Sequence, residues 1–286
     1  AEKLAAASGQ LAVDVGFWGG VVPGNERALA PLVARGVRGF KCFLVDSGVP
    51  EFKNVERRDL DRSLGILREA GVPLLVHAEL QGPISAAAPA AAALDVKSYR
   101  HHLLGRPKAA EDEAVALMIA LCREHRARVH IVHHCSSTAL GALDEARSDG
   151  LALTVETCPH YLTFAAEDIA DGATHFKCTP PIREQDNREA LWGALQRGLI
   201  DAVVSDHSPC TAALKRLDLG DFDRAWGGIS GLQLTLPATW SGARAHGASL
   251  VDVARWMSER PAALAGLARN GDIAAGKDAD LVAFEP

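Results

Sequence analysis

Short apolar runs alternate with longer amphipathic segments along most of the chain. Apolar runs of about four to eight residues, bounded by Gly or Pro, are typical of strands buried on both faces of a sheet. We predict such strands at Leu11–Phe17, Val37–Leu44, Pro73–His77, Arg128–His133, Leu151–Thr157 and Asp201–Ser205. The amphipathic segments between them predict helices.

The helices are predicted from apolar positions that recur every three or four residues. Leu60, Leu64 and Leu67 follow this spacing, and their segment closes at Gly71, a residue type common at helix C-termini. Glu111–His125 has its acids early and its bases late, the distribution that a helix dipole favours. The same periodicity predicts helices at Thr138–Arg147 and Asn187–Gln196.

Strands that alternate with helices in this way predict parallel β/α units with right-handed crossovers. We therefore expect an α/β fold of the (β/α)8 barrel type. A closed barrel of this type has eight strands, so the two strands not visible here are expected to precede Ala1. An open doubly wound sheet is the alternative, but no G-x-G-x-x-G motif follows the first predicted strand.

Three segments fall outside this alternation. Ser85–Ala93, rich in Ala and Pro, is expected to be an adaptable helix or a loop, and Thr211–Gly231 is a long polar segment that could form a lid. Gly271–Val282 is predicted to be a turn that leads into a strand of a small accessory sheet. We therefore assign the barrel to residues 1–265 and a remnant of an accessory β-sandwich to residues 266–286.

The composition narrows the class of protein. A net charge of -6 and a pI near 6.0 give no electrostatic reason to expect nucleic acid or an anionic membrane as a partner. No apolar run approaches the roughly 18 residues that span a bilayer, and the N-terminus lacks a signal-peptide layout. The six cysteines form no C-x-x-C pair, which predicts reduced thiols in a cytoplasmic enzyme.

Candidate metal ligands lie in or at the ends of four predicted strands. Lys41 lies inside one strand, His77 ends another, a histidine of the run 130–134 ends a third, and Asp206 follows the fourth. Each alone is more often an ion-pair partner, a satisfied core residue or a solvated acid. Together they favour a metal site, because imidazoles and carboxylates are good zinc ligands and the C-terminal rim of a barrel carries its chemistry. A lysine ammonium binds metal only if it is converted to an anion.

Seven blocks of sequence resemble the cyclic amidohydrolases of the amidohydrolase superfamily, and among these the allantoinase group most closely. The blocks are Gly-Phe-Lys-Cys-Phe (39–43), Val-His-Ala-Glu (76–79), Cys-Pro-His-Tyr (158–161), Lys-Cys-Thr-Pro-Pro-Ile-Arg (177–183), Val-Ser-Asp-His-Ser-Pro-Cys (204–210), Ala-Trp-Gly-Gly-Ile-Ser-Gly-Leu-Gln (225–233) and Gly-Lys-Asp-Ala-Asp (276–280). The fifth and sixth blocks favour this group over dihydropyrimidinases and dihydroorotases.

The resemblance implies a metal-dependent hydrolase of purine catabolism that opens a cyclic amide, most closely allantoin to allantoate. It implies two divalent metal ions, usually zinc, bridged by hydroxide and by a CO2-derived carbamate on Lys41. His77 and His133 (or His134) would bind the second metal, and Asp206 would bind the first and shuttle the proton as general base and acid. Thr179 and Gly228 would border the substrate, and the enzyme would be a homo-oligomer.

Two departures from the family pattern leave alternatives open. The family's His-x-His pair is expected to precede Ala1, so we expect the 286-residue chain alone to bind metal weakly and to aggregate. The strand register favours His133 as the ligand, whereas counting back from Ser136 favours His134. The rival functions are a hydantoinase or dihydropyrimidinase, which a substrate panel would separate, and a non-catalytic scaffold of the same fold, which metal content would separate.

Overall fold

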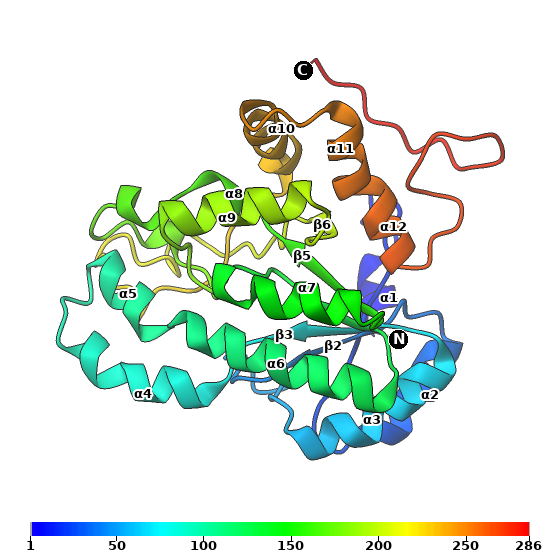
Figure 1. Ribbon diagram of the computed structural model, residues 1–286, viewed down its shortest axis with the longest axis horizontal. Coiled ribbons are helices and arrows are strands. Elements are labelled where there is room, and N and C mark those ends of the chain that lie inside the picture. Colours follow the sequence, from blue (N-terminus) through cyan, green and yellow to red (C-terminus); the bar gives the residue numbers. More distant parts are fainter. Residues whose placement is uncertain (1, 286) are drawn as a thin grey trace.

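The computed structural model describes residues 2–285. Within this range, six strands form one parallel sheet in chain order (Figure 1). The strands are β1 (Gly19–Gly20), β2 (Phe40–Phe43), β3 (Leu74–His77), β4 (Val129–Ile131), β5 (Leu153–Thr157) and β6 (Ala202–Val203). The predicted parallel β/α architecture and five of the predicted strand positions are confirmed.

Helices follow the strands and cover the outside of the sheet. In Figure 1, α3, α6 and α7 cover the face of the sheet that is turned toward the viewer. The helices of this layer and of the strand connections are α2 (Glu26–Ala34), α3 (Arg57–Ala70), α4 (Gln81–Ala92), α5 (Tyr99–Gly105), α6 (Lys108–His125), α7 (Leu140–Ser148), α8 (Pro159–Thr163) and α9 (Gln185–Gln196). Ser85–Ala93, predicted to be either an adaptable helix or a loop, is mostly helical because it lies largely within α4.

Helix α3 shows how the local sequence sets these boundaries. The Asp59 carboxylate accepts a hydrogen bond of 3.0 Å from the backbone N–H of Glu56, which forms a capping box at the start of the helix. The helix ends at Gly71, whose φ of 69° is the left-handed conformation that glycine adopts without strain. Between these ends, Leu60 and Leu64 are fully buried, so the predicted apolar face packs on the core.

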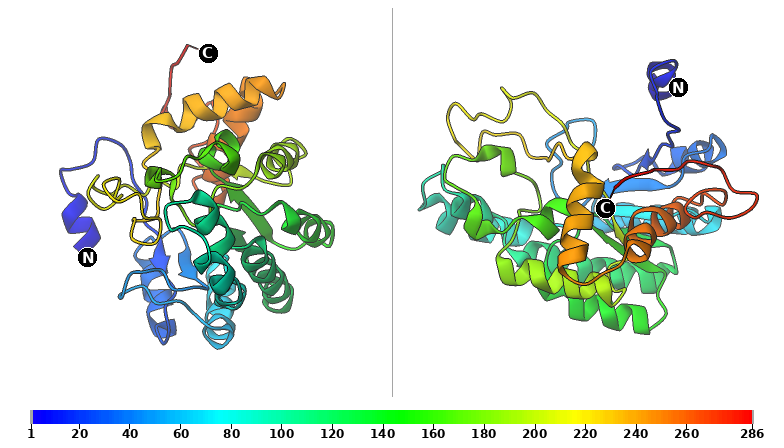
Figure 2. Two further views of the ribbon diagram at one scale, coloured as in Figure 1. Left: turned by 90° about the vertical axis from the view of Figure 1, so that its left-hand side faces the viewer. Right: turned by 90° about the horizontal axis from the view of Figure 1, so that it is seen from above.

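The predicted strand at Leu11–Phe17 is wrong. Its alternating Leu11, Val13 and Val15 side chains are exposed, and this segment lies between α1 (Glu2–Ala7) and β1 as irregular chain. Backbone pairing with β2 begins only where the Phe17 carbonyl accepts from Arg38. The apolar residues of this segment therefore did not form a strand, because those before Phe17 have no neighbouring strand in the described residues with which their backbone could pair. Figure 2 shows α1 standing away from the body of the fold.

The C-terminal part also differs from prediction. Helix α10 (Thr235–Ala245) packs against α8, and helices α11 (Leu250–Ala254) and α12 (Arg260–Leu264) flank a helical turn at Arg255–Glu259 that contacts β6. The chain beyond them is irregular up to residue 285, without the predicted strand. Ile273 and Val282 are largely exposed because no neighbouring strand pairs with them in the described residues. An accessory domain at residues 266–286 stays a prediction. Among the described helices, none is long and apolar enough to cross a membrane.

The sheet remains open between its edge strands in the described part of the chain, since β1 pairs with β2 and β6 pairs with β5 but not with each other. A cavity of about 530 Å³ lies on this open side, between Leu75, Glu156 and Val204 of the inner sheet face and the residues of α12. The segment Thr211–Gly231 is a long irregular excursion, as predicted.

Two helical glycines give a matched test of this packing. A Cβ on Gly242 would collide with the ring of the buried Trp192, whereas a Cβ on Gly65 would meet nothing within 4 Å. We expect Gly65→Ala to raise the free energy of unfolding by about 0.5–1 kcal/mol through helix propensity. We expect Gly242→Ala to lower it by about 1–3 kcal/mol through overpacking. Urea unfolding measures both, and equal effects would contradict the α9–α10 packing.

Candidate active site

The structure brings the four candidate residues together at the C-terminal end of the sheet. Lys41 lies within β2, His77 ends β3, His133 follows β4 and Asp206 follows β6. Burial is the largest cause of the shifted pKa of His77, His133 and Asp206, and the positive charge of Lys41 acts on all three in the lowering direction, so Lys41 lies within electrostatic reach of each of them. The backbone φ angles of His133 (40°) and Asp206 (42°) are uncommon outside glycine, and such strain clusters at functional sites.

The imidazoles of His77 and His133 face each other. Nδ1 of His77 lies 2.9 Å from Nε2 of His133, and Nε2 of His77 lies 2.7 Å from the Glu79 carboxylate. Because an ionised carboxylate only accepts, Nε2 of His77 carries the proton and Nδ1 presents a lone pair. Two nitrogen ligands of a tetrahedral zinc ion lie about 3.3 Å apart, so this pair is close to the spacing that one metal ion requires.

Burial and nearby cations keep both rings neutral. Burial, followed by the charges of Lys41 and Arg106, holds the pKa of His77 well below its usual range. Burial, His77 and Lys41 do the same for the pKa of His133. Nδ1 of His133 is buried without a hydrogen-bond partner among the described residues. Neutral imidazole is the form that binds metal, so the donor set fits a divalent cation.

His134 lies in a different environment from His133. Its Nδ1 is 3.9 Å from the Glu111 carboxylate, and its backbone N–H donates to the Glu156 carbonyl at 2.7 Å. Its side chain is buried beside the Glu111–Arg183 pair and has no contact with His77. Of the two histidines that the sequence left open, His133 is the one that faces the candidate metal position.

Lys41 and Asp206 have shifted proton affinities. Burial lowers the pKa of Lys41 to about 8, although the neighbouring Cys42, Asp206 and Glu156 oppose the shift. The lower pKa increases the share of neutral amine, the form that reacts with CO2. Asp206 borders the open side of the sheet and is exposed as a residue, yet partial desolvation of its carboxyl raises the pKa to about 6. Lys41 opposes that increase and Glu156 adds to it.

Glu79 supports His77 from the side opposite His133. Its carboxylate is fully buried, accepts from His77 and accepts at 2.6 Å from the Arg106 guanidinium. The second carboxylate oxygen, Oε1, has no partner among the described residues. Glu79 therefore orients the His77 ring, and the positive charge of Arg106 balances the negative charge of the buried Glu79 carboxylate.

A second buried ion pair shapes the turn after β4. Glu111 accepts from the Arg183 guanidinium at 2.7 Å and from the backbone N–H groups of Cys135 and Ser136 at 2.9 and 3.0 Å. Arg183 also donates to the Arg106 carbonyl at 2.7 Å. The turn that follows His133 is thus tied to helix α6 and to the segment before α9.

Glu79, Glu111 and Glu156 are buried or nearly buried acids for which the sequence predicts no role. Glu156 on β5 lies 2.9 Å from Nε2 of His130 on β4, and His130 lies level with Lys41 in the register of the sheet. An acid within an apolar strand was the available signal for Glu156, as was the Val-His-Ala-Glu block for Glu79. The buried partners of both acids become visible only in the folded chain.

A cavity of about 540 Å³ lies next to Arg106, the partner of Glu79, and none of the four candidate residues is among those that line it. Thr179, a predicted substrate residue, lines it together with Arg106, Lys177, Trp226 and Gly227. Gly228 is the next residue after Gly227. Its φ of 135° and its close approach to Ser208 suit only glycine, because a Cβ at this position would collide with Ser208. The cavity is the right size for a small ring.

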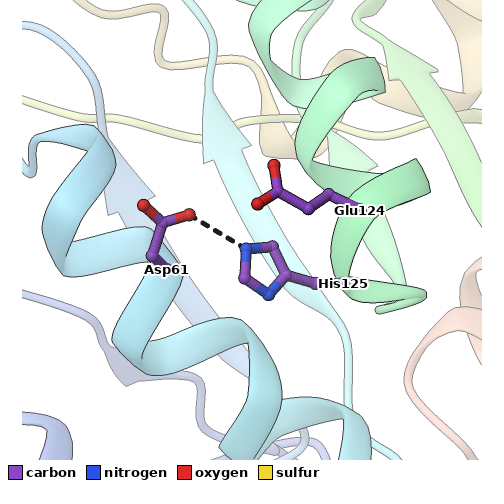
Figure 3. A group of neighbouring side chains, drawn as sticks. All are labelled: Asp61, Glu124 and His125. Carbon is purple, nitrogen blue, oxygen red and sulfur yellow. Dashed lines mark hydrogen bonds and ion pairs between the residues drawn. The ribbon is translucent and has the colours of Figure 1, made fainter.

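A third group of polar residues lies on the outside of the fold. Asp61 of α3 and Glu124 and His125 at the end of α6 bring ligand-type atoms together (Figure 3). Nε2 of His125 lies 2.9 Å from the Asp61 carboxylate, which accepts from it, and Arg57 pairs with Glu124 at 2.5 Å and with Asp61 at 3.7 Å. The arginine already compensates both carboxylates, so this cluster is a surface ion-pair network that joins two helices.

Comparison with known sequences relates this geometry to a family. A sequence model described as "Amidohydrolase family" matches residues 1–286. The chain is 49% identical over 284 residues to the allantoinase of Streptomyces avermitilis, covering 99% of this chain and 62% of the relative. It is 49% identical over 265 residues to the mitochondrial allantoinase of Aquarana catesbeiana, covering 93% and 54%. The chain thus spans between 54% and 62% of the length of these curated relatives.

Solved structures share the fold. The L-hydantoinase of Arthrobacter aurescens superposes with a TM-score of 0.92 at 29% identity, covering 97% of this chain and 62% of that protein. The dihydropyrimidinase of Brevibacillus agri gives a TM-score of 0.84 at 29% identity, covering 93% and 59%. The predicted barrel-type fold is therefore confirmed, with its sheet open in the described residues.

Removal of the Glu79 carboxylate tests the buried network. Glu79→Ala leaves the His77 N–H and the Arg106 guanidinium without their acceptor, and we expect a loss of about 3 kcal/mol in the free energy of unfolding. Breaking the exposed Arg123–Asp149 pair by Asp149→Ala serves as a control, expected to cost less than about 1 kcal/mol. Urea unfolding measures both, and similar small losses would show that Glu79 is not a buried charge partner.

Proposed function

Because the chain belongs to the amidohydrolase family, we propose that the protein that carries it hydrolyses a cyclic amide, allantoin, to allantoate. The relatives that match at 46–49% identity are named allantoinases. The observation that carries the proposal is the facing His77–His133 pair, with Lys41 and Asp206 beside it. Such a set of buried ligand-type groups has no structural need in a scaffold protein.

We propose that His77 and His133 would hold one divalent metal ion, that Asp206 would hold a second, and that Lys41, as a carbamate, would supply a further oxygen ligand. Zinc suits this donor set of imidazoles and carboxylates. When bound, such ions lower the pKa of water and polarise a carbonyl. Conversion of Lys41 to a carbamate replaces a cation by an anionic oxygen donor, which removes the charge repulsion that an ammonium would cause.

The residues of the chain supply the proton transfer and the orientation. The Asp206 carboxylate accepts a proton from the attacking water and delivers it to the ring nitrogen as the amide C–N bond breaks. The water oxygen becomes part of the new carboxylate, so the ring-opened product is the substrate plus one water. Thr179 and the backbone around Gly228 hold the amide edge of the ring against this group.

A hydantoinase or dihydropyrimidinase activity is the second candidate. It is supported by the superposition on L-hydantoinase and dihydropyrimidinase structures. The sequence identity to these proteins is 29%, against 49% to the Streptomyces avermitilis allantoinase, so hydrolysis of allantoin is the preferred function. A cytoplasmic location and a homo-oligomeric assembly are proposed from the sequence alone.

A substrate panel tests the reaction. The protein that contains these residues is assayed with allantoin, hydantoin and dihydrouracil, and product formation is followed by mass spectrometry. We expect the highest kcat/KM for allantoin and a loss of at least about 10²-fold in kcat for Asp206→Asn, because the proton acceptor is removed. Faster hydrolysis of hydantoin or dihydrouracil would favour the second candidate, and no hydrolysis of any ring would contradict both.

The adjacent histidines give a matched test of the metal ligands. We expect His133→Asn to lose bound metal in elemental analysis, since one of two facing imidazoles is removed. His134→Asn should keep the metal content of the unmodified protein, because its ring faces Glu111 instead. Circular dichroism confirms that both variants remain folded. Loss of metal from the His134 variant alone would assign the ligand role to His134.

A further inference from the structure

Lys215 lies in the long segment Thr211–Gly231, and its ammonium donates to three backbone carbonyls, two in this segment and one in the stretch around Lys177. Nζ of Lys215 donates to the carbonyls of Lys177 at 3.2 Å and Trp226 at 3.1 Å, and also to that of Gly228. A lysine ammonium has three N–H donors, and all of them are used here. The side chain is half-buried, and no carboxylate within 4.0 Å pairs with it among the described residues.

Two of these three carbonyls belong to residues that line the cavity next to Arg106, and the third belongs to Gly228, the residue after the lining residue Gly227. Lys177, Trp226 and Gly227 line the cavity, as does Thr179, two residues after the first carbonyl. The backbone N–H of Gly228 donates to the Lys177 carbonyl at 2.9 Å, and that of Trp226 donates to the Leu214 carbonyl at 2.8 Å. Lys215 therefore lies where three separate stretches of chain meet.

The carbonyl groups explain why a cation is needed at this point. Three carbonyl oxygens that converge on one position repel one another unless a donor or a cation lies between them. A half-buried ammonium, in turn, must be compensated by hydrogen bonds, and bonds from a charged donor are stronger than those between neutral groups. The lysine and the carbonyls thus stabilise each other.

A separate set of contacts fixes residues 222–223, in the middle of the same segment. The Phe222 backbone N–H donates to the Val96 carbonyl at 2.9 Å, and Asp223 lies 2.9 Å from Nε2 of His101 on α5. These contacts do not involve Lys215. Loss of the lysine should therefore loosen residues 226–228 without releasing residues 222–223.

We propose that Lys215 is a positioning residue that holds the Trp226–Gly228 wall of the cavity against Lys177–Thr179 and so sets the shape that receives the ring of the substrate. The inference rests on the proposed function for the identity of the substrate. The Lys215 ammonium acts through the backbone of these two stretches and needs no contact with the reacting atoms.

Hydrogen exchange tests the contact without any assay of activity. In Lys215→Met, we expect the Trp226 and Gly228 amides to exchange at least about tenfold faster, a shift that corresponds to losing one charge-assisted hydrogen bond. The Phe222 amide should not change. Arg216→Met is the matched control, because Arg216 is the next residue and its side chain pairs with Asp218 instead of with the wall. A thermal melt checks that both variants are folded.

Kinetics test the consequence for the substrate. With allantoin, we expect KM to increase at least about tenfold in Lys215→Met while kcat changes less than about threefold, since ring placement is affected and proton transfer is not. Unchanged exchange at Trp226 and Gly228, or unchanged KM, would overturn the proposal. If the unmodified protein hydrolyses no ring, the proposed function fails, and the exchange rates still decide whether Lys215 fixes the wall.

Discussion

The parallel register of β2 through β5 is the constraint on which the site depends. Phe43 lies opposite His77, and Lys41 lies opposite Leu75, which in turn lies opposite His130. Because side chains alternate between the faces of a strand, this register places Lys41, His77, His130 and Glu156 on one face. A slip of one residue in β3 would turn His77 outward and put Val76 in its place.

Charge compensation is the second requirement, because charged groups that are costly to bury lie around the C-terminal ends of β3 and β4. Glu79 is balanced by Arg106, and Glu111 by Arg183, with separations of 2.6 and 2.7 Å. The two pairs are linked, since Arg183 donates to the carbonyl of Arg106. A single buried network therefore supports both His77 and the turn after His133, so a change at one acid is expected to be felt at both histidines.

The cavity next to Arg106 is built differently, from irregular chain held by a cation. Its wall combines the stretch around Thr179 with the stretch around Trp226, and Lys215 joins them through carbonyls alone. Strands carry Lys41 and His77, and the turns after β4 and β6 carry His133 and Asp206, whereas the wall of the cavity depends on a few hydrogen bonds between irregular stretches. This division is physically reasonable, because loops can vary to fit a ring while the sheet keeps the reactive groups in place.

The sequence by itself determined the elements that depend on local periodicity, and it placed Lys41, His77 and Asp206 at strand ends that share a rim. It failed at Leu11–Phe17, where an alternating pattern lacks a paired neighbour, and it left His133 and His134 open. The tertiary structure decided which histidine faces His77, which arginine compensates Glu79, and that Lys215 joins two distant stretches. The reason is that periodicity reports the environment along one segment, while a hydrogen bond between residues dozens of positions apart exists only once the chain has folded.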